Sequence, residues 1–232
     1  MDLFVEGFQQ AIAKLLAPDP ELVAAAAASL VVTGSATALS IVTGVPLGAA
    51  IGMLRFRGRT AVLALANTGM GLPPVVVGLF VSVMLWRTGP LGELGWFCTR
   101  QAMIAAQYVL AVPVVVGLSA AAVQSLDPML ALQLRSLGAS RWQTLVLLAR
   151  EARLAILTAA MAGFGAVISE IGASLMTGCN IRGDTRILTT EIVFDTSRGD
   201  FGSSFALAFI LLALIFAVNA VTTWAQQRER PA

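Results

Sequence analysis

The sequence lacks histidine altogether and contains only two cysteines among its 232 residues. Zinc sites and acid–base catalytic sites are usually built on histidine or on clustered cysteines, so the composition argues against both kinds of site and predicts no cofactor in this chain. Cys98 and Cys179 could pair only if both face an oxidising compartment, and we favour the interpretation that they are two small, unpaired apolar residues. A phosphate-binding loop of the form G-x-x-x-x-G-K-[ST] is also absent, so we do not expect this chain to bind ATP.

Charged residues are scarce as well. They make up 12% of the chain, whereas 57% of the residues are hydrophobic and the mean hydropathy is +0.83. In soluble domains about a quarter of the residues are charged, so this chain has too few charged residues to cover a surface that faces water. Lipid tails can cover apolar helices instead. The composition therefore predicts an all-α, polytopic membrane helix bundle with lipid as a partner, and the net charge of +2 gives no reason to expect a nucleic acid partner.

The first sixteen residues lack a basic start followed by an apolar core, so they do not resemble a cleavable signal peptide. Apolar residues recur there at helical spacing, with Asp2, Glu6 and Lys14 between them. This pattern predicts an amphipathic helix at the membrane surface, which Pro18 and Pro20 end. We expect three parts: an interfacial helix over residues 1–20, a transmembrane domain over 21–226 and a cytoplasmic tail over 227–232.

Five segments have the roughly 20 mostly apolar residues that a membrane span needs. They are residues 22–54, 61–86, 102–126, 154–176 and 204–225. If the N-terminus lies outside, the inside segments carry nine basic and three acidic residues, and the outside segments carry six basic and nine acidic residues. The positive-inside rule therefore predicts an outer N-terminus, a cytoplasmic C-terminus and an outer location for both cysteines.

Ionisable groups are nearly missing inside these spans, where Glu170 is the only carboxylate. Carriers driven by protons or sodium need several buried polar or charged groups, so we expect the energy for any transport to come from a partner chain. Gly44, Gly48 and Gly52 lie four residues apart on one face of the first span. Such a face fits either a tight pore-forming bundle or plain helix packing, and we favour packing.

The second span contains residues that break helices. Pro73 and Pro74 remove two backbone donors, and Gly69 and Gly71 weaken the same turn. Because non-helical backbone at membrane depth survives only where protein or a water-filled cavity satisfies it, this segment is predicted to line a pathway. A proline kink buried by neighbouring helices is the alternative. The candidate pathway residues are Asn67, Thr68, Gly69, Gly71, Pro73 and Pro74.

The semi-polar stretch 127–153 lies on the predicted cytoplasmic side. Its pattern predicts a short helix to Leu137, a turn at Gly138 and a second helix capped by Ser140. An apolar stripe beside basic residues could dock into a groove of another protein or rest on lipid, and the pattern alone favours neither. The candidate docking residues are Leu130, Leu134, Arg135, Leu137, Gly138, Ala139, Ser140, Arg141 and Trp142.

Residues 137–143, which read Leu-Gly-Ala-Ser-Arg-Trp-Gln, resemble the coupling loop of ABC-importer permeases, known by its EAA motif. The sequence departs from the motif at two places. The Glu-Ala-Ala position is occupied by residues 132–134, Leu-Gln-Leu, and the Leu-Pro that usually follows is replaced by Arg150 and Glu151. In that family the loop inserts into a cleft on an ATPase subunit, so the resemblance implies two ABC ATPase subunits as partners on the cytoplasmic face.

Residues 169–201 are similar to the matching segment of molybdate and tungstate permeases, and the run that begins at Asn180 resembles the tungstate branch. Residues 72–78 and 89–92 match the same group, so the resemblance covers residues 22–225. It implies a type I ABC-importer permease fold and a homodimer in a bacterial or archaeal plasma membrane. It also implies an extracytoplasmic oxyanion-binding protein as a partner and tungstate as substrate, with molybdate, sulfate or another small anion as alternatives.

The segment that follows Glu170 carries three arginines whose charge is cancelled by nearby acidic residues. This balance fits a permease that receives its substrate from a binding protein and holds it weakly, or an ordinary solvated loop with internal ion pairs. Glu170 itself would repel a dianionic substrate, so we favour a structural or gating role for its carboxylate. The candidate outer-mouth residues are Asn180, Arg182, Thr185, Arg186, Thr189 and Thr190.

Two other classes of function have less support in the residues. A membrane-surface enzyme would need Glu170, Glu191 or Asp195 as an acid or base, but no nucleophile with a placed base accompanies them. A purely structural membrane scaffold would predict that mutations in the stretch 127–153 leave cell uptake unchanged.

Overall fold

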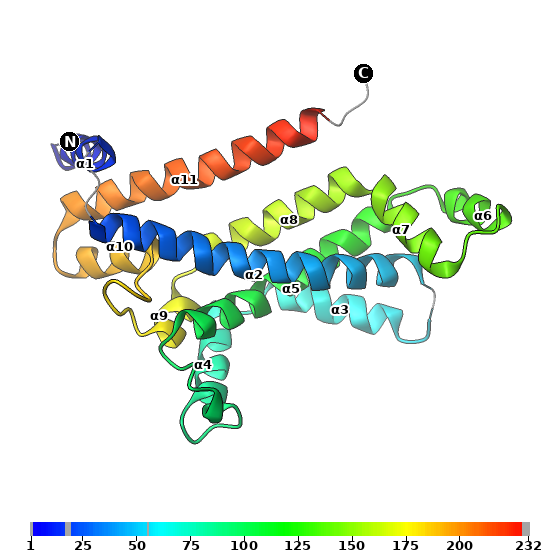
Figure 1. Ribbon diagram of the computed structural model, residues 1–232, viewed down its shortest axis with the longest axis horizontal. Helices are drawn as coiled ribbons and strands as arrows, with labels where there is room; N and C mark the ends of the chain where they lie inside the picture. The colour runs from blue at the N-terminus through cyan, green and yellow to red at the C-terminus, as the bar shows by residue number, and fades with distance from the viewer. Residues whose placement is uncertain (1, 17–19, 55, 229–232) are drawn as a thin grey trace. The chain divides into compact units, whose positions relative to one another are not determined.

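Residues 2–16, 20–54 and 56–228 are described by a computed structural model of the protein (Figure 1). Every regular element among these residues is helical, which confirms the predicted all-α class. The elements are α1 (Asp2–Leu16), α2 (Pro20–Met53), α3 (Arg59–Met70), α4 (Pro74–Leu85), the 3-10 turn η1 (Gly92–Leu94), α5 (Arg100–Gln124), α6 (Pro128–Ser136), α7 (Arg141–Glu151), α8 (Arg153–Ile168), α9 (Gly172–Gly178), α10 (Leu188–Ser197) and α11 (Phe201–Arg228).

Helices α2, α5 and α11 are each long and apolar enough to cross a membrane. The pairs α3–α4 and α8–α9 meet the same criterion together, although each pair is bent at a short break. In the described ranges the chain thus has three such helices, or up to five spans if each bent pair counts as one. These helices and pairs fall on the five segments expected from the sequence.

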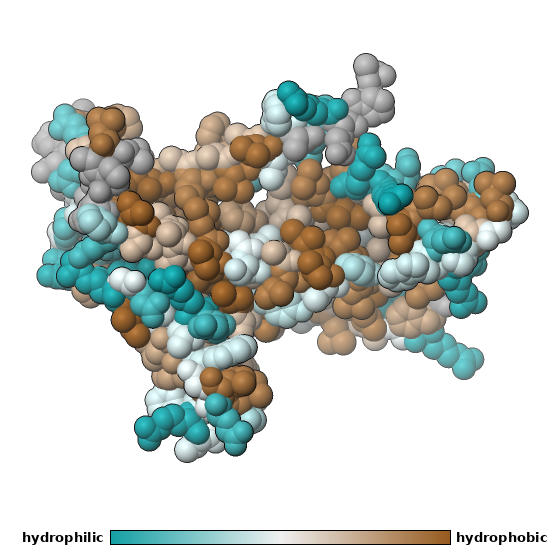
Figure 2. All heavy atoms as spheres, viewed as in Figure 1, coloured by the Kyte–Doolittle hydropathy of each residue, from teal (hydrophilic) through white to brown (hydrophobic). Residues whose placement is uncertain are grey.

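The long helices leave large apolar side chains uncovered. On α11 these include Leu212, Phe216 and Val221, and Phe216 is 74% exposed. Figure 2 shows hydrophobic side chains along α11 and hydrophilic side chains at the tip of the loop after α4. Because water would penalise so much exposed apolar surface and hydrocarbon would not, the pattern fits a helix bundle in lipid.

The chain folds into two compact units. Unit 1 comprises Met1–Ala36, Pro73–Gln107 and Val167–Val221, and unit 2 comprises Thr37–Leu72, Tyr108–Ala166 and Thr222–Ala232. In unit 1, α2 and α10 meet around the buried side chains of Leu22 and Leu188. In unit 2, the ends of α2 and α5 meet α7 around Ala49, Val123 and Leu148. Each unit therefore has an apolar core of its own.

The glycine face of α2 packs against α5 in unit 2. A Cβ atom at Gly48 would lie 2.5 Å from the carbonyl oxygen of Val116, and one at Gly52 would lie 2.8 Å from the carbonyl oxygen of Ala120. The two backbones approach so closely that a larger side chain would force them apart. This confirms the interpretation of the small face as helix packing.

Helix α1 packs on the first turns of α11 in unit 1. The rings of Phe8 and Phe209 meet edge to face with centroids 5.5 Å apart, and Gly7 lies directly against Phe205. The predicted N-terminal helix is therefore confirmed. Its position at a membrane surface stays a prediction, which the exposed side chain of Leu16 suits.

Cys98 and Cys179 form a disulfide in unit 1, with their Cα atoms 5.1 Å apart. The expectation that these cysteines are unpaired is therefore wrong. The loop before α5 lies against the end of α9, where the backbone N–H of Cys98 donates to the carbonyl of Thr177 at 3.0 Å. This contact between distant segments of the chain brings the two side chains within bonding reach.

Candidate functional site

The second expected span is interrupted at residues 71–73. The N–H of Gly71 donates to the carbonyl of Thr68 at 3.0 Å and ends α3. Pro73 has an extended backbone, with φ −62° and ψ 120°, and Pro74 begins α4. Since neither proline can donate a backbone hydrogen bond, the helix ends where the sequence predicted a break.

None of the twelve residues of α3 is buried. Leu65 is 72% exposed, and the polar side chains of Asn67 and Thr68 are exposed as well. One side of the helix packs on α5, where Leu63 and Ala66 meet the cluster that contains Val116 and Ala120. A Cβ atom at Gly69 would lie 2.6 Å from the Cβ of Pro113. The uncovered face must meet lipid, water or a second chain, and Asn67 and Thr68 suit water or a second chain better than lipid.

The other half of the broken span, α4, packs on α9 within unit 1. A Cβ atom at Gly78 would lie 2.7 Å from the Cα of Ala173. The hydroxyl of Ser82 donates to the carbonyl of Met176 at 3.0 Å. The segment that begins at Pro74 is therefore anchored on α9 by close backbone contact and by a hydrogen bond between the helices.

Glu170 is 9% exposed and lies at the break between α8 and α9. One of its carboxylate oxygens, Oε1, accepts a hydrogen bond from the backbone N–H of Ala173 at 3.0 Å. Its backbone carbonyl accepts a second one from the hydroxyl of Thr189 at 3.2 Å. The carboxylate thus satisfies a donor at the start of α9. The structural or gating role expected from the sequence stays a prediction.

Helices α6 and α7 form a helical hairpin in unit 2. The Asp127 carboxylate caps α6 by accepting from the N–H of Met129 at 2.8 Å, and Gly138 has the left-handed conformation (φ 89°) that turns the chain. Ser140 and Gln143 form a reciprocal capping box at the start of α7. The predicted helix, turn and capped helix are all present.

The α6–α7 hairpin exposes large apolar side chains. Leu137 is 85% exposed and Trp142 is 68% exposed, whereas Leu130 and Leu134 pack on the core of unit 2. Between the two helices lies an open groove of about 720 Å³. The side chains that line this groove (the α6–α7 groove) belong to Leu134, Leu137, Gly138, Ala139, Trp142, Gln143, Val146, Leu147 and Arg150.

The sequence reasoning missed part of this lining. Val146, Leu147 and Arg150 belong to the groove but were not among the candidate residues. A local signal was available, because Val146 follows Trp142 by four residues and Leu147 follows Gln143 by four, so each continues a helix face that already carried a residue of the groove. Arg135 and Arg141, by contrast, were candidates and do not line the groove, and both line a second cavity of unit 2.

Ion pairs fix the segment after α9 to other parts of unit 1. Nε of Arg182 lies 3.0 Å from Oε2 of Glu21 at the start of α2. Nε of Arg100 lies 3.0 Å from Oδ1 of Asp184 and donates to the carbonyl of the same residue. Arg182 therefore pairs with a residue far away in sequence, which no local pattern could have indicated.

Three candidate threonines of this segment are buried. The exposed fractions of Thr185, Thr189 and Thr190 do not exceed 4%. The hydroxyl of Thr185 accepts from the N–H of Ile181 at 2.9 Å, and that of Thr190 accepts from the N–H of Ile187 at 3.1 Å. These threonines hold the segment together from within, so their side chains do not form a surface.

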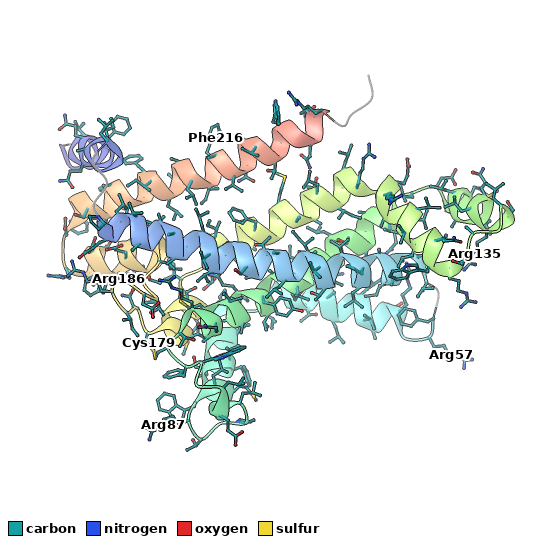
Figure 3. The ribbon with its side chains drawn as sticks, in the orientation of Figure 1. Arg57, Arg87, Arg135, Cys179, Arg186 and Phe216 are labelled. Atoms are coloured by element: carbon teal, nitrogen blue, oxygen red, sulfur yellow. A yellow bond between two sulfur atoms is a disulfide. The ribbon has the colours of Figure 1, made fainter. Side chains whose placement is uncertain are left out.

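Arg186 and Asn180 remain closer to the surface. The guanidinium of Arg186 lies 4.4 Å from the centroid of the Phe194 ring and its Nη2 donates to the carbonyl of Asn180 at 3.4 Å. Arg198 approaches the same ring at 5.3 Å. Figure 3 shows Arg186 and Cys179 in the same part of unit 1, beside α9 and α10. Two cations thus share one aromatic ring next to the disulfide-linked segment.

The described residues contain no cluster of three or more His, Cys, Asp or Glu side chains that could hold a metal ion. The candidate sites are instead an uncovered helix, an open groove and a segment held by a disulfide and ion pairs. The arrangement offers surfaces for other molecules to contact.

Known proteins resemble this chain over most of its length. It is 42% identical over 205 residues to a probable anion ABC transporter permease protein of Haloferax volcanii, covering 86% of this chain and 88% of the relative. It is 34% identical over 221 residues to the tungstate uptake system permease protein TupB of Peptoclostridium acidaminophilum, covering 95% of this chain and 97% of the relative.

A solved structure of the MetNI methionine ABC transporter contains a chain that superimposes with a TM-score of 0.73 and 17% identity. The match covers 90% of this chain and 96% of that chain, and at this identity it shows the fold alone. Residues 44–231 match the family described as the binding-protein-dependent transport system inner membrane component. The protein therefore belongs to this family of inner-membrane transport components.

Proposed function

We propose that this chain is the permease subunit of an ABC importer for tungstate or a related oxyanion. The names of its relatives support this proposal, because one is a probable anion permease and another a tungstate uptake permease. In this proposal two copies of the chain form the pathway, and ATP is hydrolysed by separate subunits. The permease itself carries no cofactor.

The α6–α7 groove is the observation that carries the proposal. Leu137 and Trp142 are large and apolar, yet both are mostly exposed. Their backbone is held in place by the turn at Gly138 and the cap at Ser140. Apolar side chains presented on a rigid surface are typical of protein interfaces. We assign this groove to the ATPase subunit, one for each copy of the permease.

Helix α3 supports the assignment of a pathway between two copies. No residue of α3 is buried within its own chain. This exposure is explained if one face of α3 contacts the second copy and another face contacts water. Asn67 and Thr68 would then border the pathway, since polar side chains at membrane depth usually face a cavity or a partner. Pro73 and Pro74 would mark the point at which the lining changes from α3 to α4.

The disulfide supports an outer N-terminus. Disulfides persist in oxidising compartments, and the positive-inside rule independently assigns Cys98 and Cys179 to the outer side. The same side would receive the oxyanion from a separate binding protein. Arg182 suits such an encounter, because its side chain is 68% exposed although it is paired with Glu21.

Substitution of Leu137 by glutamate tests the proposal. The charge would enter the α6–α7 groove at an exposed position. The chain should therefore fold, while the ATPase subunit is lost from the co-purified complex and uptake falls. Leu91→Glu is a matched control, since Leu91 is 48% exposed but lies in the loop before η1. Full retention of the ATPase and of uptake by the Leu137→Glu protein would contradict the proposal.

A further inference from the structure

A cavity of about 640 Å³ in unit 2 collects positive charge. It lies between the end of α2, the start of α3, the end of α5 and the helices α6 and α7. Its lining includes three arginines, Arg59, Arg135 and Arg141. The lining has one carboxylate, which belongs to Asp127. A concave surface with such an excess of guanidinium groups attracts anions.

Arg59 is fixed at the wall of this cavity. Its Nε donates to the carbonyl of Ile51 at 2.8 Å, and its Nη2 donates to the carbonyl of Gly52 at 2.9 Å. These bonds satisfy two carbonyls at the C-terminus of α2, where no helical N–H is left to bond them. A guanidinium has five N–H donors, so three remain for a ligand.

Arg135 and Arg141 supply the charge that is not used within the chain. Both residues are exposed, and no side-chain hydrogen bond or ion pair joins either guanidinium to the residues that the structure describes. The Asp127 carboxylate is engaged in capping α6. The cavity therefore presents two unpartnered cations beside one that is held rigidly.

The cavity and the α6–α7 groove use different sides of α6. Leu132 and Arg135 line the cavity, whereas Leu134 and Leu137 line the groove. A ligand in the cavity would therefore leave the groove open to a protein partner.

We propose that this cavity binds an oxyanion group of phosphate-like shape, either as a free inorganic anion or as the headgroup of an anionic lipid. Arginine matches such a group well because its planar fork donates paired hydrogen bonds to two oxygens. The apolar part of the lining, which includes Leu54, Leu126 and Leu132, would pack the carbon skeleton of a lipid or enclose water around a free anion. The proposal rests on unit 2 alone and not on which substrate crosses the membrane.

The test uses the full-length chain in nanodiscs of phosphatidylcholine. In one arm, sodium tungstate and inorganic phosphate are titrated separately and binding is measured calorimetrically. In the other arm, the chain is purified from membranes that contain phosphatidylcholine and phosphatidylglycerol, and native mass spectrometry counts the retained lipids. The variant Arg135→Gln/Arg141→Gln removes both unpartnered cations, and its exposed positions should leave the melting temperature unchanged.

The control is Arg57→Gln, which removes an exposed arginine two residues before Arg59 that does not line the cavity. Figure 3 labels Arg57 in the turn after α2 and Arg135 on α6. We expect the double variant to weaken binding at least about tenfold in one of the arms, because two charge-assisted contacts are lost, and the control to stay within about twofold.

Anion binding that weakens in this way supports a free anion, and a lost preference for phosphatidylglycerol supports a lipid headgroup. Binding that is absent from both arms, or that changes equally in the double variant and the control, would overturn the proposal.

Discussion

The Glu170 carboxylate lies 3.0 Å from the backbone nitrogen of Ala173 and accepts its hydrogen bond at the start of α9. The Thr189 hydroxyl bonds the Glu170 carbonyl at the same time, so one residue joins α9 to α10. A carboxylate within an expected membrane span thereby has one donor from its own chain, the N–H of Ala173. This bond offsets part of the cost of burying the carboxylate, which has no ion pair with a basic side chain in the described part of the chain.

Replacing Glu170 by alanine should destabilise the protein by about 1–2 kcal/mol, because the N–H of Ala173 would be left without its acceptor. Glu170→Gln keeps an acceptor oxygen at the same place and should cost less than half as much. Thermal unfolding in detergent compares the two. Equal loss from both variants would mean that the negative charge matters and not the capping bond.

Removing the disulfide should loosen the segment around α9. Because Cys98 and Cys179 close a long loop, we expect Cys98→Ser to lower stability by about 2–4 kcal/mol. The melting temperature of the unchanged protein should fall on reduction, while that of the variant should not respond to the reductant.

The same cysteines report on the membrane orientation. A maleimide that cannot cross the membrane should label the unchanged protein in intact cells only after reduction with an equally impermeant reductant. Labelling that requires opening of the cells would place the disulfide on the inner side and contradict the orientation proposed above.

The contact between α2 and α5 makes Gly48 intolerant of any side chain. Gly48→Ala brings a Cβ atom to 2.5 Å from the Val116 carbonyl oxygen, so the helices must separate, at a cost of about 1–3 kcal/mol. Gly34→Ala is the matched control on the same helix, since a Cβ atom there would meet nothing within 4 Å. Comparable melting temperatures for both variants would show that the close approach does not matter for stability.

The exposed face of α3 gives a test of the pathway. In Thr68→Cys protein the new thiol should react with a water-soluble maleimide in membranes, and the rate should depend on ATP if the pathway opens and closes. Phe216→Cys on α11 is the control, because its position is exposed but surrounded by apolar side chains suited to lipid. The two native cysteines are bonded to each other and leave no competing thiol.

Local features were predictable from the sequence. Ser140 and Gln143 cap α7 because their spacing alone creates the two reciprocal bonds. Pro73 and Pro74 interrupt the second span because proline lacks a backbone donor wherever it occurs. The five spans were predictable because each depends only on the length and hydropathy of its own segment and not on which segments pack beside it.

Features that depend on tertiary proximity were not predictable. The disulfide between Cys98 and Cys179 requires the loop before α5 to meet the end of α9. The burial of Thr189 and the pairing of Arg182 with Glu21 likewise follow from packing between distant segments. Their charge and polarity predicted an exposed surface at the outer end of the pathway. In the structure, many of their hydrogen bonds and ion pairs are made to other residues of unit 1.

Uptake by the reconstituted complex tests the central claim most directly. Proteoliposomes that contain this chain, its ATPase partner and the cognate binding protein should accumulate tungstate only with ATP, and molybdate should compete less well than unlabelled tungstate. Omission of the ATPase or substitution of Leu137 by glutamate should abolish accumulation. Tungstate uptake that proceeds without the ATPase, or complexes that carry neither tungstate nor any other oxyanion, would contradict the account.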